Sequence, residues 1–531
     1  MRRLSRNILR LSLAVIIAAV CLLPAVLLAP RGICRFDEPY QMLNTLDWRG
    51  TALAPLSALC GAAYASLTGG TYLAFRYFAL GCAALSIIAG AWWMWRRTGR
   101  YRASLGVGAF CLFMGVTNRS FMIWYGWDSL TVLTVTLSGL LLLDALRRPT
   151  LWRLGLLGLL TAVAFLVRVP NIALLAVVTG AMAIYAPRGR RLRPALFYIC
   201  MTLAFSILGL SFLYGSPMEW LCILISSPVP EHSLRDMTLP VLEKALFITP
   251  AVVLLWGVHH LIRRTLARRH PWRTVLVCGG AALMFFYFLR RGFMFPSGYA
   301  FVALFSLAVA AAIYYGRHTP RHGLAAVAVI VAAVALVPCA GSNCDLDKVI
   351  LWPLFPPLMA LLLPRLRTHS RVFMALVGSV LLVFTYFQAR YVSRTFGYWE
   401  DYDDATELMT DGPLRGMYTS PGNAAAFRAV TAEMRALTAD GSEPLVLRGY
   451  PDGYIYEYVL GLPNPFMRNR FDFGNVFGDP DYLAWTASRL ESPVTVLYVI
   501  PRDAGFSPMQ SLLQSRLHPV VTTDRYIIYK N

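Results

Sequence analysis

Apolar stretches of roughly 16 to 20 residues recur along the first three quarters of the chain, separated by short polar connections. A helix of that length crosses the hydrocarbon core of a bilayer. The pattern therefore predicts an α-helical polytopic membrane protein with about 13 transmembrane helices. The predicted spans cover residues 11–29, 77–95, 105–116, 130–146, 154–167, 172–185, 196–214, 242–261, 275–289, 299–315, 324–337, 349–363 and 372–386.

The last quarter of the chain has a different pattern and is polar enough to form a folded domain. Helical and strand-like runs alternate in it, which is typical of a small α/β domain. We therefore expect a transmembrane domain over residues 1–388, which includes an outside loop at 30–75, and a C-terminal α/β domain over 389–531. The predicted elements of the second domain are a helix at 421–437 and strands at 444–448, 494–499 and 526–529.

Composition and charge agree with a membrane protein. Hydrophobic residues make up 57% of the chain and charged residues 15%, and the mean hydropathy is +0.55, which excludes an ordinary soluble protein. The net charge of +21 would suit a nucleic-acid partner, but arginines gather in every second connection, as at 96–102 and 263–273. This is the positive-inside pattern of cytoplasmic loops. We expect no nucleic-acid partner, and a multi-pass protein of a bacterial inner (plasma) membrane with a cytoplasmic N-terminus and an extracytoplasmic C-terminal domain.

The first outside loop carries two adjacent carboxylates, Asp37 and Glu38, just beyond the first span. Ionisable groups at a membrane boundary are costly and usually mark a site; the alternative is a pair that decorates a solvated loop. The same loop is long enough for one or two short interfacial helices, and residues 53–67 are predicted to form one, with Pro55 in its first turn.

Other polar residues fall at the same, outer ends of the predicted spans. A carboxylate there can take a proton from an attacking hydroxyl while cations hold a phosphate-like leaving group. Two carboxylates could also share a divalent metal ion. The candidate site residues are Asp37, Glu38, Arg76, Asp128, Arg168, Asn171, Arg290, Arg291, Asn343 and Lys348.

Four short motifs carry a resemblance to a known family. An acidic pair soon after the first span is matched by Phe36-Asp37-Glu38, and a Pro-Leu element by Ala54-Pro55-Leu56. An arginine that opens the second span is matched by Phe75-Arg76-Tyr77, and an acidic residue before the fourth span by Trp127-Asp128. With the predicted topology, the chain resembles the GT-C superfamily of integral-membrane glycosyltransferases, in particular protein O-mannosyltransferases and aminoarabinose lipid A transferases.

The resemblance implies a GT-C-like catalytic domain that moves a sugar, with inversion, from a polyprenyl-phosphate donor to a glycan, lipid or protein acceptor on the extracytoplasmic side. It implies that Asp37 deprotonates the acceptor, that Glu38 supports it, and that Asp128 binds a divalent metal ion or orients the acceptor. The predicted substrate contacts are Arg76, Arg168, Asn171, Arg290, Arg291, Asn343 and Lys348.

Several alternatives stay open. Asp128 could cap a helix that starts at Ser129, and Arg168 could snorkel to the interface. A lipid-linked glycan transporter or flippase would need ionisable residues at mid-span, where this chain has almost none, and a polysaccharide polymerase or ligase would need a larger central loop than residues 215–240. The tyrosines at 450–458 suit carbohydrate stacking, although core and membrane-facing contacts are the favoured interpretation.

Overall fold

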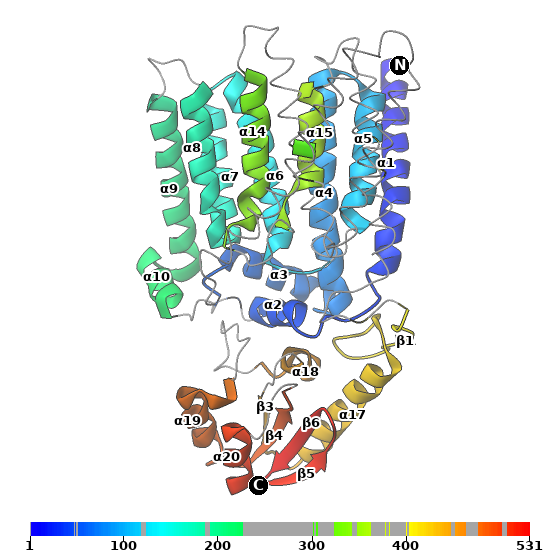
Figure 1. Ribbon diagram of the computed structural model, residues 1–531, viewed down its shortest axis with the longest axis vertical. Coiled ribbons are helices and arrows are strands. Elements are labelled where there is room, and N and C mark those ends of the chain that lie inside the picture. The colour runs from blue at the N-terminus through cyan, green and yellow to red at the C-terminus, as the bar shows by residue number, and fades with distance from the viewer. Residues whose placement is uncertain are drawn as a thin grey trace, which may run out of the picture.

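A computed structural model describes most of the N-terminal half of the chain and most of its last quarter (Figure 1). The described residues are 2–46, 51–117, 124–185, 192–226, 323–341, 348–362, 403–447, 452–463, 476–501 and 507–531, with isolated positions between them such as Trp48 and Glu400.

The apolar runs form helices that lie side by side along the long axis of the molecule (Figure 1). Four of the described helices are long and apolar enough to cross a membrane: Ile8–Leu28, Tyr72–Thr98, Trp127–Arg147 and Leu192–Tyr214. The predicted spans between 242 and 315 and at 372–386 lie outside the described residues apart from single positions, so the number of spans stays a prediction. The helices of this bundle are α1 (Arg2–Leu28), α4 (Tyr72–Thr98), α5 (Tyr101–Thr117), α6 (Trp127–Arg147), α7 (Leu151–Val167), α8 (Ala173–Tyr185), α9 (Leu192–Tyr214), α10 (Pro217–Ser226), α14 (Gly323–Leu336) and α15 (Leu351–Leu362).

Local sequence signals set the ends of α4. Thr71 caps its N-terminus by accepting a hydrogen bond from the Ala74 N–H, and Gly99 ends it in the left-handed conformation at φ 66°. Arg96 and Arg97 lie in the last turn, where they complement the helix dipole. In the middle of the helix Gly90 allows close packing on α15, because a side-chain carbon there would collide with the carbonyl oxygen of Pro353.

The chain reverses direction at the end of the bundle that faces the C-terminal part. Two short helices, α2 (Asp37–Leu46) and α3 (Pro55–Thr68), lie across the helix ends there (Figure 1). Helix α3 begins at Pro55, within the range predicted for an interfacial helix. A 3-10 turn, η2 (Val169–Ile172), joins α7 to α8, and a second, η3 (Val337–Cys339), follows α14 at the same end.

The C-terminal part contains a four-stranded sheet with strand order β3-β4-β6-β5. Strands β3 and β4 are parallel, and the other neighbours are antiparallel. All side chains of β4 are buried, because apolar clusters cover both faces of the sheet. The elements are β1 (Glu407–Leu408), β2 (Tyr418–Thr419), α17 (Pro421–Leu437), β3 (Glu443–Leu447), α18 (Gly453–Leu460), η6 (Val476–Gly478), α19 (Pro480–Arg489), β4 (Val494–Val499), α20 (Pro508–Arg516), β5 (His518–Thr522) and β6 (Tyr526–Lys530).

Three helices of this part start with the same signal, a capping side chain followed by proline. Ser420, Asp479 and Ser507 each accept hydrogen bonds from backbone N–H groups of the first turn. Proline at the next position has no N–H to leave unpaired and its φ suits a helix. Helix α17 and strands β3, β4 and β6 occupy the ranges expected from the sequence, whereas the expected division of the chain at 388/389 falls on residues that are not described.

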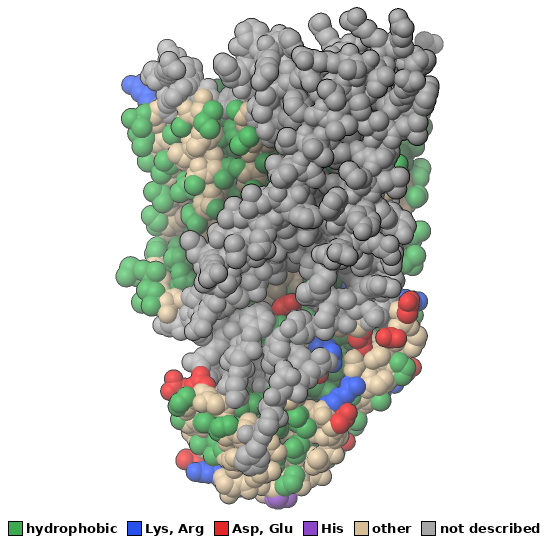
Figure 2. Space-filling model, viewed as in Figure 1, with side chains coloured by type: hydrophobic (Ala, Val, Ile, Leu, Met, Phe, Trp, Pro, Cys, Tyr) green, Lys and Arg blue, Asp and Glu red, His purple; other side chains and the backbone are tan. Residues whose placement is uncertain are grey.

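The surface changes character between the two parts. Figure 2 shows hydrophobic side chains over the visible sides of the helices, and lysine, arginine, aspartate and glutamate gathered mainly over the C-terminal part. Large apolar side chains such as Leu9 and Phe212 are exposed on the bundle. An apolar outer surface is the one expected of helices in lipid.

Candidate active site

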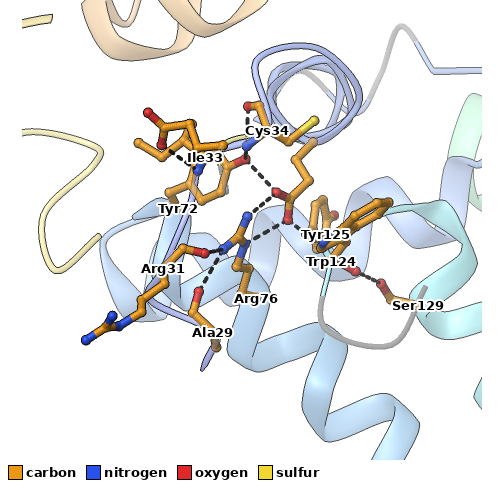
Figure 3. Close-up of polar contacts among 11 residues, drawn as sticks. Ala29, Arg31, Ile33, Cys34, Tyr72, Arg76, Trp124, Tyr125 and Ser129 are labelled. Carbon is orange, nitrogen blue, oxygen red and sulfur yellow. Dashed lines mark hydrogen bonds and ion pairs between the residues drawn. The ribbon is translucent and has the colours of Figure 1, made fainter. Parts of the chain in front are cut away.

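A buried ion pair between Glu38 and Arg76 fixes the start of α2 on α4 (Figure 3). Arg76 Nε and Nη2 donate to the two carboxylate oxygens of Glu38 at 3.0 and 2.6 Å. The same carboxylate accepts the Tyr72 hydroxyl at 2.6 Å and the Tyr125 N–H at 3.2 Å. Only 1% of Glu38 and 2% of Arg76 is exposed. The bidentate geometry and the two further donors compensate the cost of burying both charges.

Arg76 also donates hydrogen bonds into the protein interior. Its Nη1 donates to the carbonyl oxygens of Ala29 and Arg31 at 2.8 and 3.2 Å (Figure 3). One guanidinium thus joins the end of α1, the following loop and α2. These contacts favour a positioning role for Glu38 and Arg76 beneath the neighbouring carboxylate, in place of direct contact with a substrate.

Asp37 differs sharply from the adjacent Glu38. Its side chain is half-buried, and no described residue donates a hydrogen bond to it. Burial raises the pKa of the Asp37 carboxyl to about 6; Lys348 opposes this rise and Glu38 adds to it. A carboxylate with a pKa near neutrality accepts a proton more readily than an ordinary aspartate does. The geometry therefore leaves Asp37 as the carboxylate of the pair that is suited to proton transfer.

Asp128, in the first turn of α6, holds two cations. Lys348 Nζ lies 2.7 Å from one of its carboxylate oxygens and Arg168 Nη1 lies 3.3 Å from the other. The N-cap of α6 is Gly126, whose N–H donates to Ser129 Oγ at 3.1 Å, so the interpretation of Asp128 as a cap for a helix starting at Ser129 is wrong.

Arg168 and Asn171 build the corner between α7 and α8. Arg168 donates to the carbonyl oxygens of Pro338 at 2.6 Å and Gly341 at 3.3 Å and is buried, so it does not snorkel. Asn171 is fully buried, and its amide donates to Thr131 Oγ1 at 3.0 Å. The amide also donates to the carbonyl oxygen of Ala164 at 2.9 Å, and these contacts within the protein favour a positioning role for Asn171 under the site.

The structure thus gathers four of the predicted residues, Asp37, Asp128, Arg168 and Lys348, into one cluster. Lys348 connects them, since it is paired with Asp128 and is close enough to lower the pKa of Asp37. Arg290, Arg291 and Asn343 lie outside the described residues, so their predicted contacts stay predictions. The sequence analysis missed Tyr72 and Tyr125, because no local pattern marks a tyrosine hydroxyl or a backbone N–H that meets a distant carboxylate.

Among the described residues, no group of three or more His, Cys, Asp or Glu side chains could hold a divalent metal ion. Asp128 faces Lys348 and Arg168, whose positive charges disfavour a third cation beside the same carboxylate. The predicted metal at Asp128 does not fit these contacts.

No protein-family model and no curated protein matches this chain. Several solved structures are similar to it, of which two are described. One is the oligosaccharyltransferase of Archaeoglobus fulgidus, in complex with Zn and sulfate, with a TM-score of 0.49, 13% identity, and coverage of 91% of this chain and 68% of that one. The other is ArnT from Cupriavidus metallidurans, bound to undecaprenyl phosphate, with a TM-score of 0.44, 13% identity, and coverage of 99% and 98%.

Proposed function

We propose that this chain is an inverting glycosyltransferase that moves a sugar from a polyprenyl-phosphate donor to a hydroxyl acceptor on the extracytoplasmic side of a membrane. The observation that carries the proposal is the half-buried Asp37, with a pKa raised to about 6, beside the Lys348–Asp128–Arg168 cluster. A proton acceptor beside cations suits a reaction that couples a hydroxyl attack to the departure of a phosphate.

Asp37 acts as the general base. Its carboxylate takes the proton of the acceptor hydroxyl while the hydroxyl oxygen forms a bond to the anomeric carbon. The bond between that carbon and the phosphate oxygen breaks, and its electron pair leaves with the polyprenyl phosphate. Because attack and departure occur on opposite faces of the sugar, the anomeric configuration inverts.

Lys348 and Arg168 stabilise the negative charge of the departing phosphate. Asp128 keeps both cations at the site through contacts of 2.7 and 3.3 Å before the donor binds. Preorganised charge of this kind lowers the barrier without a reorganisation cost during the reaction. Long apolar helices such as Tyr72–Thr98 agree with a donor whose carrier chain lies in the bilayer.

The experiment is a transfer assay with the purified full chain in nanodiscs. Wild-type protein receives a panel of radiolabelled polyprenyl-phosphate sugars and a membrane extract as acceptor, and release of the lipid phosphate is followed. The matched control is Glu443→Ala, which removes an exposed ion pair with Arg489 in the C-terminal part. Turnover of at least one donor by both proteins supports the proposal. Binding of undecaprenyl phosphate without turnover of any donor would contradict it and favour a transporter or flippase.

A further inference from the structure

Each residue from Ile33 to Phe36, the segment that precedes Asp37, contacts a distant part of the chain. Ile33 N–H donates to Glu400 at 3.0 Å, and Cys34 exchanges hydrogen bonds with the Tyr72 hydroxyl at 3.0 and 3.1 Å (Figure 3). Glu400 is in turn bound by the Thr419 hydroxyl at 2.6 and 2.7 Å. The loop before α2 is therefore tied both to α4 and to the C-terminal part of the chain.

The next two residues contact α18 and the turn before it. Arg35 Nη1 lies 3.1 Å from Asp452 Oδ2, and both side chains are largely buried. The Phe36 ring packs edge-on against Tyr454 with centroids 5.0 Å apart, and Tyr40, one turn further along α2, packs against the same ring at 5.1 Å. Tyr454 thus sits between two side chains that flank Asp37 in sequence and is itself buried.

Backbone contacts reinforce this docking. Tyr418 N–H donates to Pro30 O at 2.7 Å, and the Tyr458 hydroxyl donates to Gly70 O at 2.8 Å. The α2 helix and the C-terminal part share one apolar cluster, which includes Met42 and Phe427. The base-bearing helix is therefore packed between the bundle and the C-terminal part.

We propose that Asp452 and Tyr454 of the C-terminal part are positioning residues for Asp37. This inference rests on the proposed function, since it takes Asp37 as the base. Asp452 fixes the residue two positions before Asp37, and Tyr454 fixes the residues one before it and three after it. A shift of about 1 Å in a reacting group can lower a rate by about a hundredfold, so the C-terminal part contributes to turnover without touching the reacting atoms.

Tyr454 packs on Phe36 and Tyr40, and burial is the first cause of the raised pKa of Asp37. The charged and titratable groups that interact with it are Lys348, Glu38 and Cys34. None of these groups belongs to the C-terminal part. Replacing Asp452 or Tyr454 therefore removes none of the groups that interact electrostatically with Asp37. A change in the titration of Asp37 would then report its position and hydration.

The test measures two quantities separately, the pKa of Asp37 and the rate of turnover. Carbodiimide modification requires a protonated carboxyl, so its pH dependence, read at Asp37 by mass spectrometry, follows the pKa of that residue in nanodiscs. Turnover is measured in parallel with the donor that wild type uses. The variants are Asp452→Ala, Asp452→Asn and Tyr454→Ala, with Tyr454→Phe as the conservative variant and Glu443→Ala as the matched control.

We expect the midpoint of Asp37 modification to fall from about 6 toward 3.8 in Asp452→Ala and Tyr454→Ala. We also expect kcat to fall about tenfold to a hundredfold with KM little changed. Tyr454→Phe, which keeps the ring, and Glu443→Ala should behave as wild type. Asp452→Asn keeps the size of the side chain and is used in place of Asp452→Ala if that variant does not fold. Exchanging the two charges, as Arg35→Asp together with Asp452→Arg, should restore turnover.

Two results separate this inference from the proposed function. In the first, wild type turns over a donor, and the folded Asp452 and Tyr454 variants keep the same midpoint of Asp37 modification and the same kcat. This result would overturn the positioning role and leave the proposed transferase function intact. A shifted midpoint in the variants of a chain that turns over no donor would overturn the proposed function alone, because the modification does not depend on transfer.

Discussion

Lys348 Nζ lies 2.7 Å from Asp128 Oδ2, and Lys348 also acts on Asp37 by lowering the pKa of its carboxyl. One ammonium group therefore couples the two acidic residues of the candidate site. When a phosphate enters, it competes with both carboxylates for the same charge. Under the proposed function, Lys348 links binding of the donor phosphate to the proton affinity of Asp37.

Replacement of Lys348 should change binding and pH dependence together. In Lys348→Ala, loss of the positive charge should raise the pKa of Asp37 further above 6, and loss of a charge-assisted contact should weaken undecaprenyl phosphate binding about tenfold to a hundredfold. The measurements are the pH profile of turnover and equilibrium binding. Lys530→Ala, which breaks a pair with Asp440 in the C-terminal part, is the control. An unaltered pH profile with unaltered binding would remove Lys348 from the site.

The pH dependence of wild-type turnover should carry an acidic limb near pH 6. Burial raises the pKa of Asp37 from 3.8 to about 6, so the carboxylate is protonated and unable to accept a proton below that pH. The rate should therefore rise with pH through about 6 and then level off. The pH profile of kcat/KM measures the pKa of the titrating group in the free enzyme. A limb near the ordinary value of an aspartate, 3.8, would show that Asp37 is not the group that titrates.

Asp37→Asn should be at least as stable as wild type at neutral pH. Because the pKa of Asp37 is higher in the folded chain than in the unfolded one, the folded chain binds the proton more tightly, and the carboxyl lowers stability as pH rises from 3.8 to about 6. Asparagine stays neutral and escapes this loss, as is common for functional residues. Thermal unfolding in detergent at pH 7 and pH 4 tests it. If Asp37→Asn unfolded at a clearly lower temperature than wild type at pH 7, the charged Asp37 carboxylate would have a stabilising partner in the folded chain.

Replacement of Glu38 or Arg76, in contrast to that of Asp37, should destabilise the folded chain. Removing either partner leaves a buried charge unpaired, so Glu38→Gln or Arg76→Met should each lower the free energy of unfolding by about 3–5 kcal/mol. The double variant Glu38→Gln with Arg76→Met should lose less than the two single losses combined, because no unpaired charge remains. Denaturation in detergent measures the cycle. Additive losses would show that the two residues act independently.

Local patterns in the sequence were sufficient to locate much of the fold. Apolar runs identified α4, α6 and α9, and short strand-like runs identified β4 and β6. Strand β5 was missed because most of its side chains are exposed and Pro519 interrupts it. Helix α18 was missed because Tyr454, Tyr456 and Tyr458 form a buried core surface; the described tyrosines agree with the favoured interpretation as core residues.

The site was predicted less completely than the fold. The position of Asp37 and Glu38 after the first span indicated a site, but the different roles of the two depend on partners far along the chain. Glu38 is neutralised by Arg76 from α4, whereas Asp37 meets Lys348 from the loop before α15. Such pairings come from tertiary packing, and no spacing within one segment encodes them.

The most direct test of the central claim is a single-turnover comparison of wild type and Asp37→Asn with the donor found in the transfer assay. Both proteins are loaded with that donor and mixed with the membrane extract that supplies the acceptor, and release of the lipid phosphate is followed at pH 7.5. We expect equal donor binding and a rate at least about a hundredfold lower in the variant, because asparagine cannot take the proton of the acceptor. Equal rates in the two proteins would contradict the assignment of Asp37 as the base.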